Sequence, residues 1–243
     1  MLKPSTYRTF IIEEEMIHHL MLQTVSIKRN GLFYGKLGIA IAFFEYGKYR
    51  HNPIYTDYAK ELKDSLPQKI EDNISLDFAT GLCGFGWGIE YMVQHQFIDS
   101  DSAKVCADID QRIMTMNMRR MTNLSLENGL EGFLHYILIR IKGAKMRGNP
   151  IPFDNVFLKD TYDSLISLNS LSVNAENVSN GLKQAFISYM DTGLLFYQPD
   201  ISLFISDLEI KNEEDILSAK LGLSDGLAGK LVKIVYEQKS LPS

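Results

Sequence analysis

Apolar and polar residues alternate along the chain in long blocks, and the pattern within each block follows a helical period. Nearly continuous apolar stretches, such as residues 38–44 and 133–139, are typical of helices that are buried on most faces. Between them lie segments with apolar residues on one helical face, over residues 55–70, 103–121 and 156–168. Strand-like patterning is confined to the short run 201–205. The sequence therefore predicts an all-α fold in which buried inner helices alternate with amphipathic outer helices.

A short motif precedes the apolar stretches and divides the chain into repeats. It consists of a polar residue followed by Gly-Leu, and its glycines are Gly31, Gly81, Gly129, Gly181 and Gly226. Their spacings of 50, 48, 52 and 45 residues each accommodate two helices with connections. The polar side chain is suited to cap a helix, and glycine permits a turn. We therefore expect about five helical hairpins in one domain over residues 1–243, stacked as an open solenoid or closed into a ring.

The charge and the cysteine content narrow the range of functions. The chain carries a net charge of −5, which argues against general nucleic-acid binding, because phosphate binding needs a basic surface. No apolar run reaches the roughly 18 residues that cross a bilayer, and the N-terminal residues do not resemble a signal peptide. Two cysteines cannot form a disulfide framework. We therefore predict a cytoplasmic protein without a membrane span.

Three glycine motifs resemble those of the lanthionine synthetase C-like family. Residues 31–40, Gly-Leu-Phe-Tyr-Gly-Lys-Leu-Gly-Ile-Ala, resemble the first motif, and residues 80–91 resemble the second. Ser-Asp-Gly-Leu-Ala-Gly at residues 224–229 resembles the motif of the closing repeat. The resemblance spans roughly residues 10–238 and implies an α/α toroid with inner and outer helix layers. This chain would be a divergent and shortened member of the family.

Active members of that family bind zinc, which activates a peptide cysteine thiolate for addition to a dehydrated residue. Their ligands come from a Trp-Cys segment and a Cys-His-Gly segment, and this chain contains neither. We therefore expect no zinc site, and whether the chain is an enzyme stays open. Cys83 is the weak alternative ligand, because it lies in a glycine motif at the predicted start of an inner helix; a packed thiol explains it more simply.

The predicted binding surface is the mouth of the toroid, where the inner helices begin. Aromatic and polar residues near these helix starts would contact a peptide or a partner protein there. They are Tyr34, Phe85, Trp87, Glu90, Glu131, His135 and Asp225. The simpler interpretation is that the aromatic residues and His135 belong to the core and that the acids cap helices or offset helix dipoles.

The leading functional hypothesis is a protein of peptide modification that binds a peptide substrate or a peptide-modifying enzyme without zinc-dependent cyclase activity. The alternative is an active enzyme of one of two kinds. It is either a divergent zinc-dependent thioether cyclase or a carbohydrate-active α/α toroid. The latter would use paired carboxylates from Asp77, Glu90, Glu127, Glu131 and Asp225.

Overall fold

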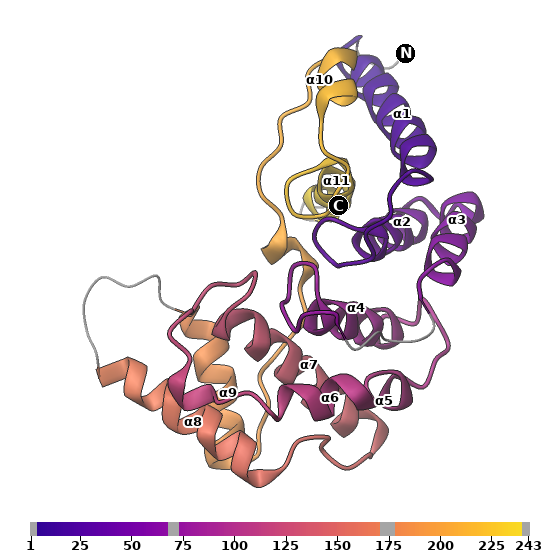
Figure 1. Cartoon of the computed structure of the whole chain (residues 1–243). Coiled ribbons are helices and arrows are strands. Elements are labelled where there is room, and N and C mark those ends of the chain that lie inside the picture. Colours follow the sequence, from indigo (N-terminus) through magenta and orange to yellow (C-terminus); the bar gives the residue numbers. More distant parts are fainter. Residues whose placement is uncertain (1–3, 68–72, 171–177, 240–243) are drawn as a thin grey trace. The chain divides into compact units, whose positions relative to one another are not determined.

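The computed structural model describes residues 4–67, 73–170 and 178–239 (Figure 1). These residues form α-helices and two short 3₁₀ helices, and no strand occurs among them, which confirms the predicted all-α class. The strand-like run at 201–205 falls largely in the 3₁₀ helix η2, because Asp200 caps it by accepting a hydrogen bond from the Ser202 amide. No helix within the described ranges combines the length and apolarity needed to cross a membrane.

The chain divides into two compact units, and the first contains both ends of the chain. The first unit, Met1–Gln68 with Asp200–Ser243, holds α1 (Pro4–Thr24), α2 (Lys36–Arg50), α3 (Pro53–Asp64), η2 (Ile201–Phe204), α10 (Glu213–Ser218) and α11 (Leu227–Lys239). The second unit, Lys69–Pro199, holds α4 (Leu82–Gln94), α5 (Ser102–Val105), α6 (Ala107–Ile113), η1 (Met118–Arg120), α7 (Leu130–Arg147), α8 (Asn155–Ser170) and α9 (Asn180–Thr192). The single domain over residues 1–243 and its toroidal form stay predictions.

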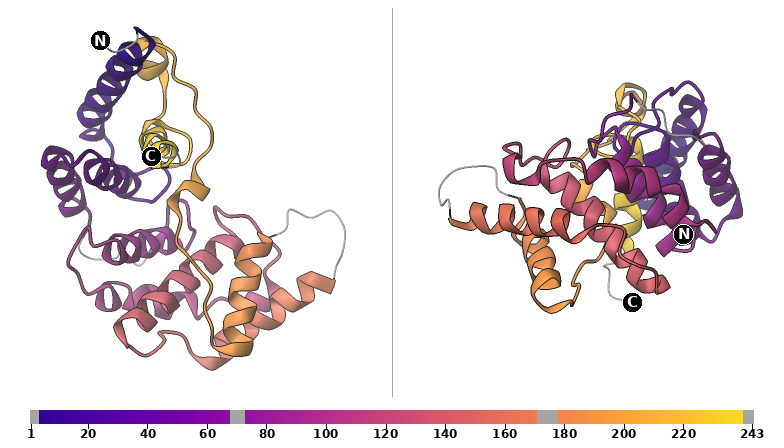
Figure 2. Two further views of the ribbon diagram at one scale, coloured as in Figure 1. Left: turned by 180° about the vertical axis from the view of Figure 1, so that it is seen from behind. Right: turned by 60° about the horizontal axis from the view of Figure 1, so that its bottom comes forward.

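The expected inner and outer helices are distinguished by burial. In α2, every residue from Leu37 to Gly47 is buried, whereas in α3 the buried residues are Ala59 and Leu62. Figure 1 and the left view of Figure 2 show α2 between α3 and α11, and α2 contacts both helices. Of the predicted outer segments, residues 156–168 lie within α8. Residues 103–121 form three short helices instead of one, and 55–70 ends as a helix at Asp64, with 68–70 outside the described residues.

Four inner helices, α2, α4, α7 and α11, begin with the same backbone turn. In each, the first helical N–H donates to the carbonyl seven residues earlier. The donor–acceptor pairs are Lys36 to Arg29, Leu82 to Ser75, Leu130 to Asn123 and Leu227 to Lys220, at 3.0, 2.9, 3.0 and 2.8 Å. The residue before each helix is glycine, and a Cβ there would lie 2.4–2.8 Å from that same carbonyl oxygen. The turn therefore admits glycine alone at this position.

This geometry corrects two of the five predicted repeat positions. The glycine of the first turn is Gly35 rather than Gly31, and the turn glycines Gly35, Gly81, Gly129 and Gly226 are separated by 46, 48 and 97 residues. Gly181 lies inside α9, which begins after Ser179, so this copy has no such turn. The expected side-chain caps are also wrong for α2, α4 and α7, where glycine itself occupies the cap position.

Neighbouring turns contact each other in one recurring way. In the second unit, the amides of Phe78 and Ala79 donate to the Glu127 carbonyl at 2.8 and 3.0 Å. In the first unit, Leu223 and Ser224 donate from the corresponding positions to the Phe33 carbonyl at 2.7 and 3.3 Å. The last repeat thus packs on the first as the second packs on the third.

Packing at the helix starts predicts a large difference between two glycines, Gly38 of α2 and Gly181 of α9. At Gly38, a Cβ would lie 1.9 Å from the backbone oxygen of Leu32, whereas at Gly181 its nearest neighbour, Ser179 Oγ, is 3.9 Å away. Gly38→Ala is expected to lower the free energy of unfolding by about 3 kcal/mol, as overpacking does. Gly181→Ala, the matched control, should raise it by up to about 1 kcal/mol through helix propensity. Urea titrations of both variants measure this, and equal effects would refute the close contact between Gly38 and the Leu32 carbonyl.

Candidate functional site

Trp87 and His135 occupy equivalent positions on α4 and α7, six residues after their turn glycines. The Tyr197 hydroxyl lies 3.0 Å from both Trp87 Nε1 and His135 Nδ1. The indole N–H donates to Tyr197, so the hydroxyl is left to donate to a neutral His135. Burial lowers the pKa of His135 to about 3, which agrees with this neutral form. Trp87 is fully buried and His135 is 6% exposed, so both belong to the core and not to a binding surface, contrary to prediction.

Tyr197 belongs to the segment of residues 193–199 that follows α9. Two lysines of α7 hold this segment by its backbone: Lys142 Nζ donates to the Tyr197 carbonyl at 3.0 Å, and Lys145 Nζ donates to Gly193 at 2.5 Å. Through Tyr197, the segment contacts Trp87 of α4 and His135 of α7. Sequence reasoning did not find Tyr197, because it lies 110 and 62 residues from its partners and outside every repeat motif.

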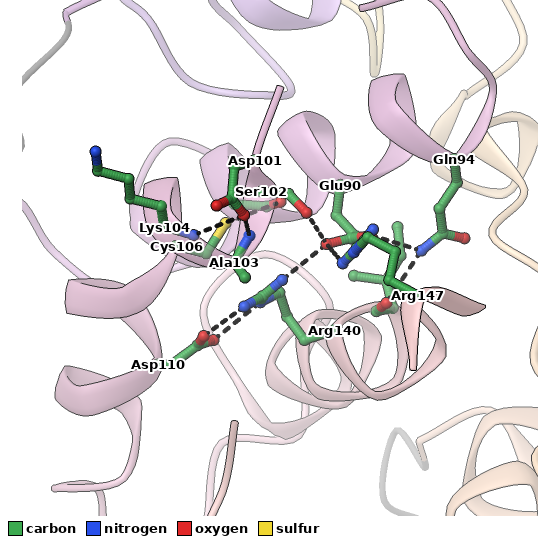
Figure 3. Close-up of polar contacts among 12 residues, drawn as sticks. Glu90, Gln94, Asp101, Ser102, Ala103, Lys104, Cys106, Asp110, Arg140 and Arg147 are labelled. Atoms are coloured by element: carbon green, nitrogen blue, oxygen red, sulfur yellow. Dashed lines mark hydrogen bonds and ion pairs between the residues drawn. The ribbon is translucent and has the colours of Figure 1, made fainter. Parts of the chain in front are cut away.

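Glu90, another predicted site residue, is fully buried at the centre of an ion network (Figure 3). Arg140 Nη1 contacts Glu90 at 2.7 Å, and its Nε and Nη2 donate to the two oxygens of Asp110 at 3.1 and 2.6 Å. Arg147 donates to both oxygens of Glu90 at 2.8 and 3.0 Å. Ser102 donates to Glu90 at 2.7 Å, so this carboxylate is enclosed and takes no part in a mouth, contrary to prediction.

The charges of this network compensate one another. Burial by itself would raise the pKa of Glu90, but hydrogen bonds from Arg147, Ser102 and Gln94 lower it overall. Burial raises the pKa of Asp110, while Arg140 and Tyr136, whose hydroxyl donates at 2.6 Å, favour its charged form. The network also requires a residue without a side chain at position 143, where Gly143 leaves room for Glu90 and Arg147. A Cβ at Gly143 would lie 2.0 Å from Glu90 Oε1 and 2.6 Å from Arg147 Nη2.

The other four predicted residues are partly exposed and fall in different units. Phe85 near the start of α4 and Glu131 near the start of α7 belong to the second unit. The Glu131 carboxylate accepts a hydrogen bond from the Ser179 amide at 3.3 Å, and burial raises its pKa. Tyr34 and Asp225 lie on the two adjoining turns of the first unit. A single mouth that contains all four residues stays a prediction.

The carboxylates proposed for glycoside cleavage have structural partners in the described residues. Burial would raise the pKa of Asp77, but it is lowered overall by hydrogen bonds from Ser75, Thr80 and Gly81, which hold the turn before α4. Asp225 pairs with Lys220 at 2.5 Å, and Glu90 lies in the ion network. These positions are those of caps and ion pairs, as the simpler interpretation expected.

The residues present do not fit the zinc ion that the family resemblance implies. Cys83 and Cys106 are both fully buried. Burial raises the pKa of the Cys83 thiol well above its usual value and that of Cys106 to about 12, so neither thiolate forms near neutral pH. Within the described ranges, no group of three His, Cys, Asp or Glu side chains is placed to hold a metal ion. Cys83 is thus placed as a packed thiol.

Comparison with known proteins assigns no function to this chain, so the functional proposal rests on the geometry described above. No family model, no curated protein and no solved structure matches this chain.

Proposed function

We propose that this chain is a lanthionine synthetase C-like protein that serves peptide modification by binding a peptide, without a zinc-dependent cyclisation step of its own. The observation that carries the proposal is the turn shared by α2, α4, α7 and α11. Three of its four glycines, Gly35, Gly81 and Gly226, lie in the motifs that resemble the family, and steric contact with a backbone carbonyl gives each of them a structural reason. The packing of the last turn on the first supports the closed order of repeats that the family would have.

The binding surface proposed in the second unit is formed by Phe85 and Glu131 at the starts of α4 and α7. The contact of the turns at Ala79 and Glu127 places these two helix starts beside each other. Phe85 supplies partly exposed apolar area, and Glu131 supplies a carboxylate beside it. Because burial raises the pKa of Glu131, its charged form gains from a cationic partner. A peptide with an aliphatic side chain next to a lysine matches this pair.

A labelled peptide tests the proposal directly. The probe is a fluorescein-labelled 20-residue peptide with serine, threonine, cysteine and lysine, titrated with the whole chain while polarisation is recorded. We expect saturable binding that Glu131→Gln weakens about tenfold, the loss of one charge-assisted hydrogen bond. Glu61→Gln on the exposed side of α3 is the matched control and should leave the affinity unchanged.

The same preparation tests the absence of a zinc step. Peptide affinity should be equal after chelator treatment and after addition of zinc, and a dehydrated form of the peptide should gain no thioether under either condition. Zinc-dependent thioether formation would overturn the proposal in favour of a divergent cyclase. Equal affinity of wild type and Glu131→Gln would exclude the surface at α4 and α7.

A further inference from the structure

A cleft of about 290 Å³ lies beside the ion network of the second unit, at the end of α7 opposite to Glu131. Asp110, Arg140 and Arg147 contribute its charged lining, and Gln111 and Asn149 contribute two amides. The remaining lining is apolar and mostly small: Ala103, Ala107, Met114, Ala144, Pro150 and Pro152. Asp110 and Arg140 are 4% and 2% exposed, so the polar part of the cleft is built into the core.

The two arginines have more N–H donors than the hydrogen bonds of the network use, whereas its acceptor atoms are mostly occupied. Each guanidinium group has five N–H donors. Arg140 uses three of its own on Asp110 and Glu90, and Arg147 uses two on Glu90. The Asp110 oxygens already accept from Arg140 and Tyr136, and Glu90 lies behind the arginines and does not line the cleft. A ligand group that bonds to these remaining N–H donors must therefore be a hydrogen-bond acceptor.

The charges that face the cleft favour an anionic acceptor. Two guanidinium groups and one carboxylate line it, and that carboxylate is held by Arg140. Of the two arginines, Arg147 is the more accessible, because its side chain is 28% exposed against 2% for Arg140, and it lines the cleft while bound to Glu90. A planar carboxylate matches the fork of such N–H groups.

We propose that this cleft binds a carboxylate that carries an apolar group of about the size of an aromatic side chain. The carboxylate would accept hydrogen bonds from Arg147, and the apolar group would lie against Ala107, Ala144 and Met114. A cavity of about 150 Å³ suffices for benzene, so about 290 Å³ holds a ring with its acid. The same chemistry occurs in a small aryl acid and in the C-terminal residue of a peptide. The site does not depend on the proposed peptide surface, because it lies at the other end of α7.

The test compares an acid with its amide. N-acetyl-L-phenylalanine and N-acetyl-L-phenylalaninamide are titrated into the whole chain by calorimetry at low salt. The acid should bind at least tenfold more tightly than the amide, and added salt should weaken its binding. Replacing Arg147 would also remove two hydrogen bonds from the buried Glu90 carboxylate. The informative variant is therefore Ala107→Leu, which fills the cleft from a residue outside the network. Thr115→Leu, at an exposed neighbouring position that does not line the cleft, is its control.

The expected result is loss of acid binding in Ala107→Leu and unchanged binding in Thr115→Leu. Equal binding of acid and amide, no binding of either, or normal binding by Ala107→Leu would each overturn the proposal. A tetrapeptide that ends in phenylalanine, with a free or an amidated C-terminus, identifies the source. Binding of the free form supports a peptide terminus, and binding of the small acid alone supports a small molecule. If the fluorescein-labelled peptide does not bind, the proposed function fails, but binding of the carboxylate in the cleft is unaffected.

Discussion

Replacing Arg140 with methionine is expected to lower the free energy of unfolding by about 3–5 kcal/mol. Arg140 lies between Glu90 and Asp110, and both carboxylates are almost completely buried (Figure 3). Without the guanidinium group, Asp110 loses its cationic partner, and Arg147 is the one cation that the network still supplies to Glu90. Methionine retains much of the apolar stem of arginine, so the loss reports the missing charge more than a missing volume.

Arg119→Met provides the matched control for this experiment. Arg119 also contacts two carboxylates, Asp160 at 2.9 Å and Asp163 at 2.7 Å, but its side chain is 52% exposed. An exposed ion pair contributes about 0–1 kcal/mol, because water and salt screen it. Urea titrations at neutral pH compare the two variants with wild type. A loss in Arg140→Met no larger than that in Arg119→Met would show that the buried network does not stabilise the second unit.

His135 is expected to make the protein less stable as the pH falls. Its folded-state pKa, lowered to about 3, lies below the unfolded value of about 6.5. Between these two values the unfolded chain binds a proton that the folded chain does not, so the free energy of unfolding decreases as the pH falls from about 6.5 toward 3. At about 1.4 kcal/mol per pKa unit, the contribution reaches roughly 2 kcal/mol at pH 5 and is absent at pH 7.5.

The His135→Gln variant isolates this contribution from that of the carboxylates. Glutamine can accept the Tyr197 hydrogen bond and does not titrate. Its free energy of unfolding relative to wild type should therefore rise by about 2 kcal/mol between pH 7.5 and pH 5 in urea titrations. His18→Gln, at an exposed position of α1, is the control. A relative stability of His135→Gln that does not change with pH would mean that His135 is accessible to protons in the folded protein.

Local sequence determined the helices and most of the repeat. Continuous apolar runs mark inner helices because a helix with apolar residues on every face must be buried on every face, as α2 is from Leu37 to Gly47. Three turn glycines, Gly81, Gly129 and Gly226, were predicted for a similar reason, since a local backbone contact excludes any Cβ there. At Gly31 and Gly181 the same motif predicted a turn glycine wrongly. A Gly-Leu pair does not show whether a backbone carbonyl will lie against the glycine.

Charged residues within apolar runs indicate buried ion pairs, but the sequence does not show which residues pair. Glu90 and Arg140 stand among apolar residues of α4 and α7, which predicts that each needs a partner. Their pairing over 50 residues, and the third member Asp110, follow from how the helices pack. In the same way, the sequence indicated aromatic residues near helix starts but could not distinguish exposed from buried ones.

The sequence by itself determined the all-α class, most of the inner helices and three of the four turn glycines, because each rests on contacts within a few residues along the chain. Tertiary structure alone decided that Tyr197 joins Trp87 to His135 and that Glu90 turns inward to two arginines. It also decided where the cleft beside Arg147 lies. These features join residues separated by tens of positions, and their geometry depends on the packing of whole helices. Neither helical period nor residue spacing encodes that packing.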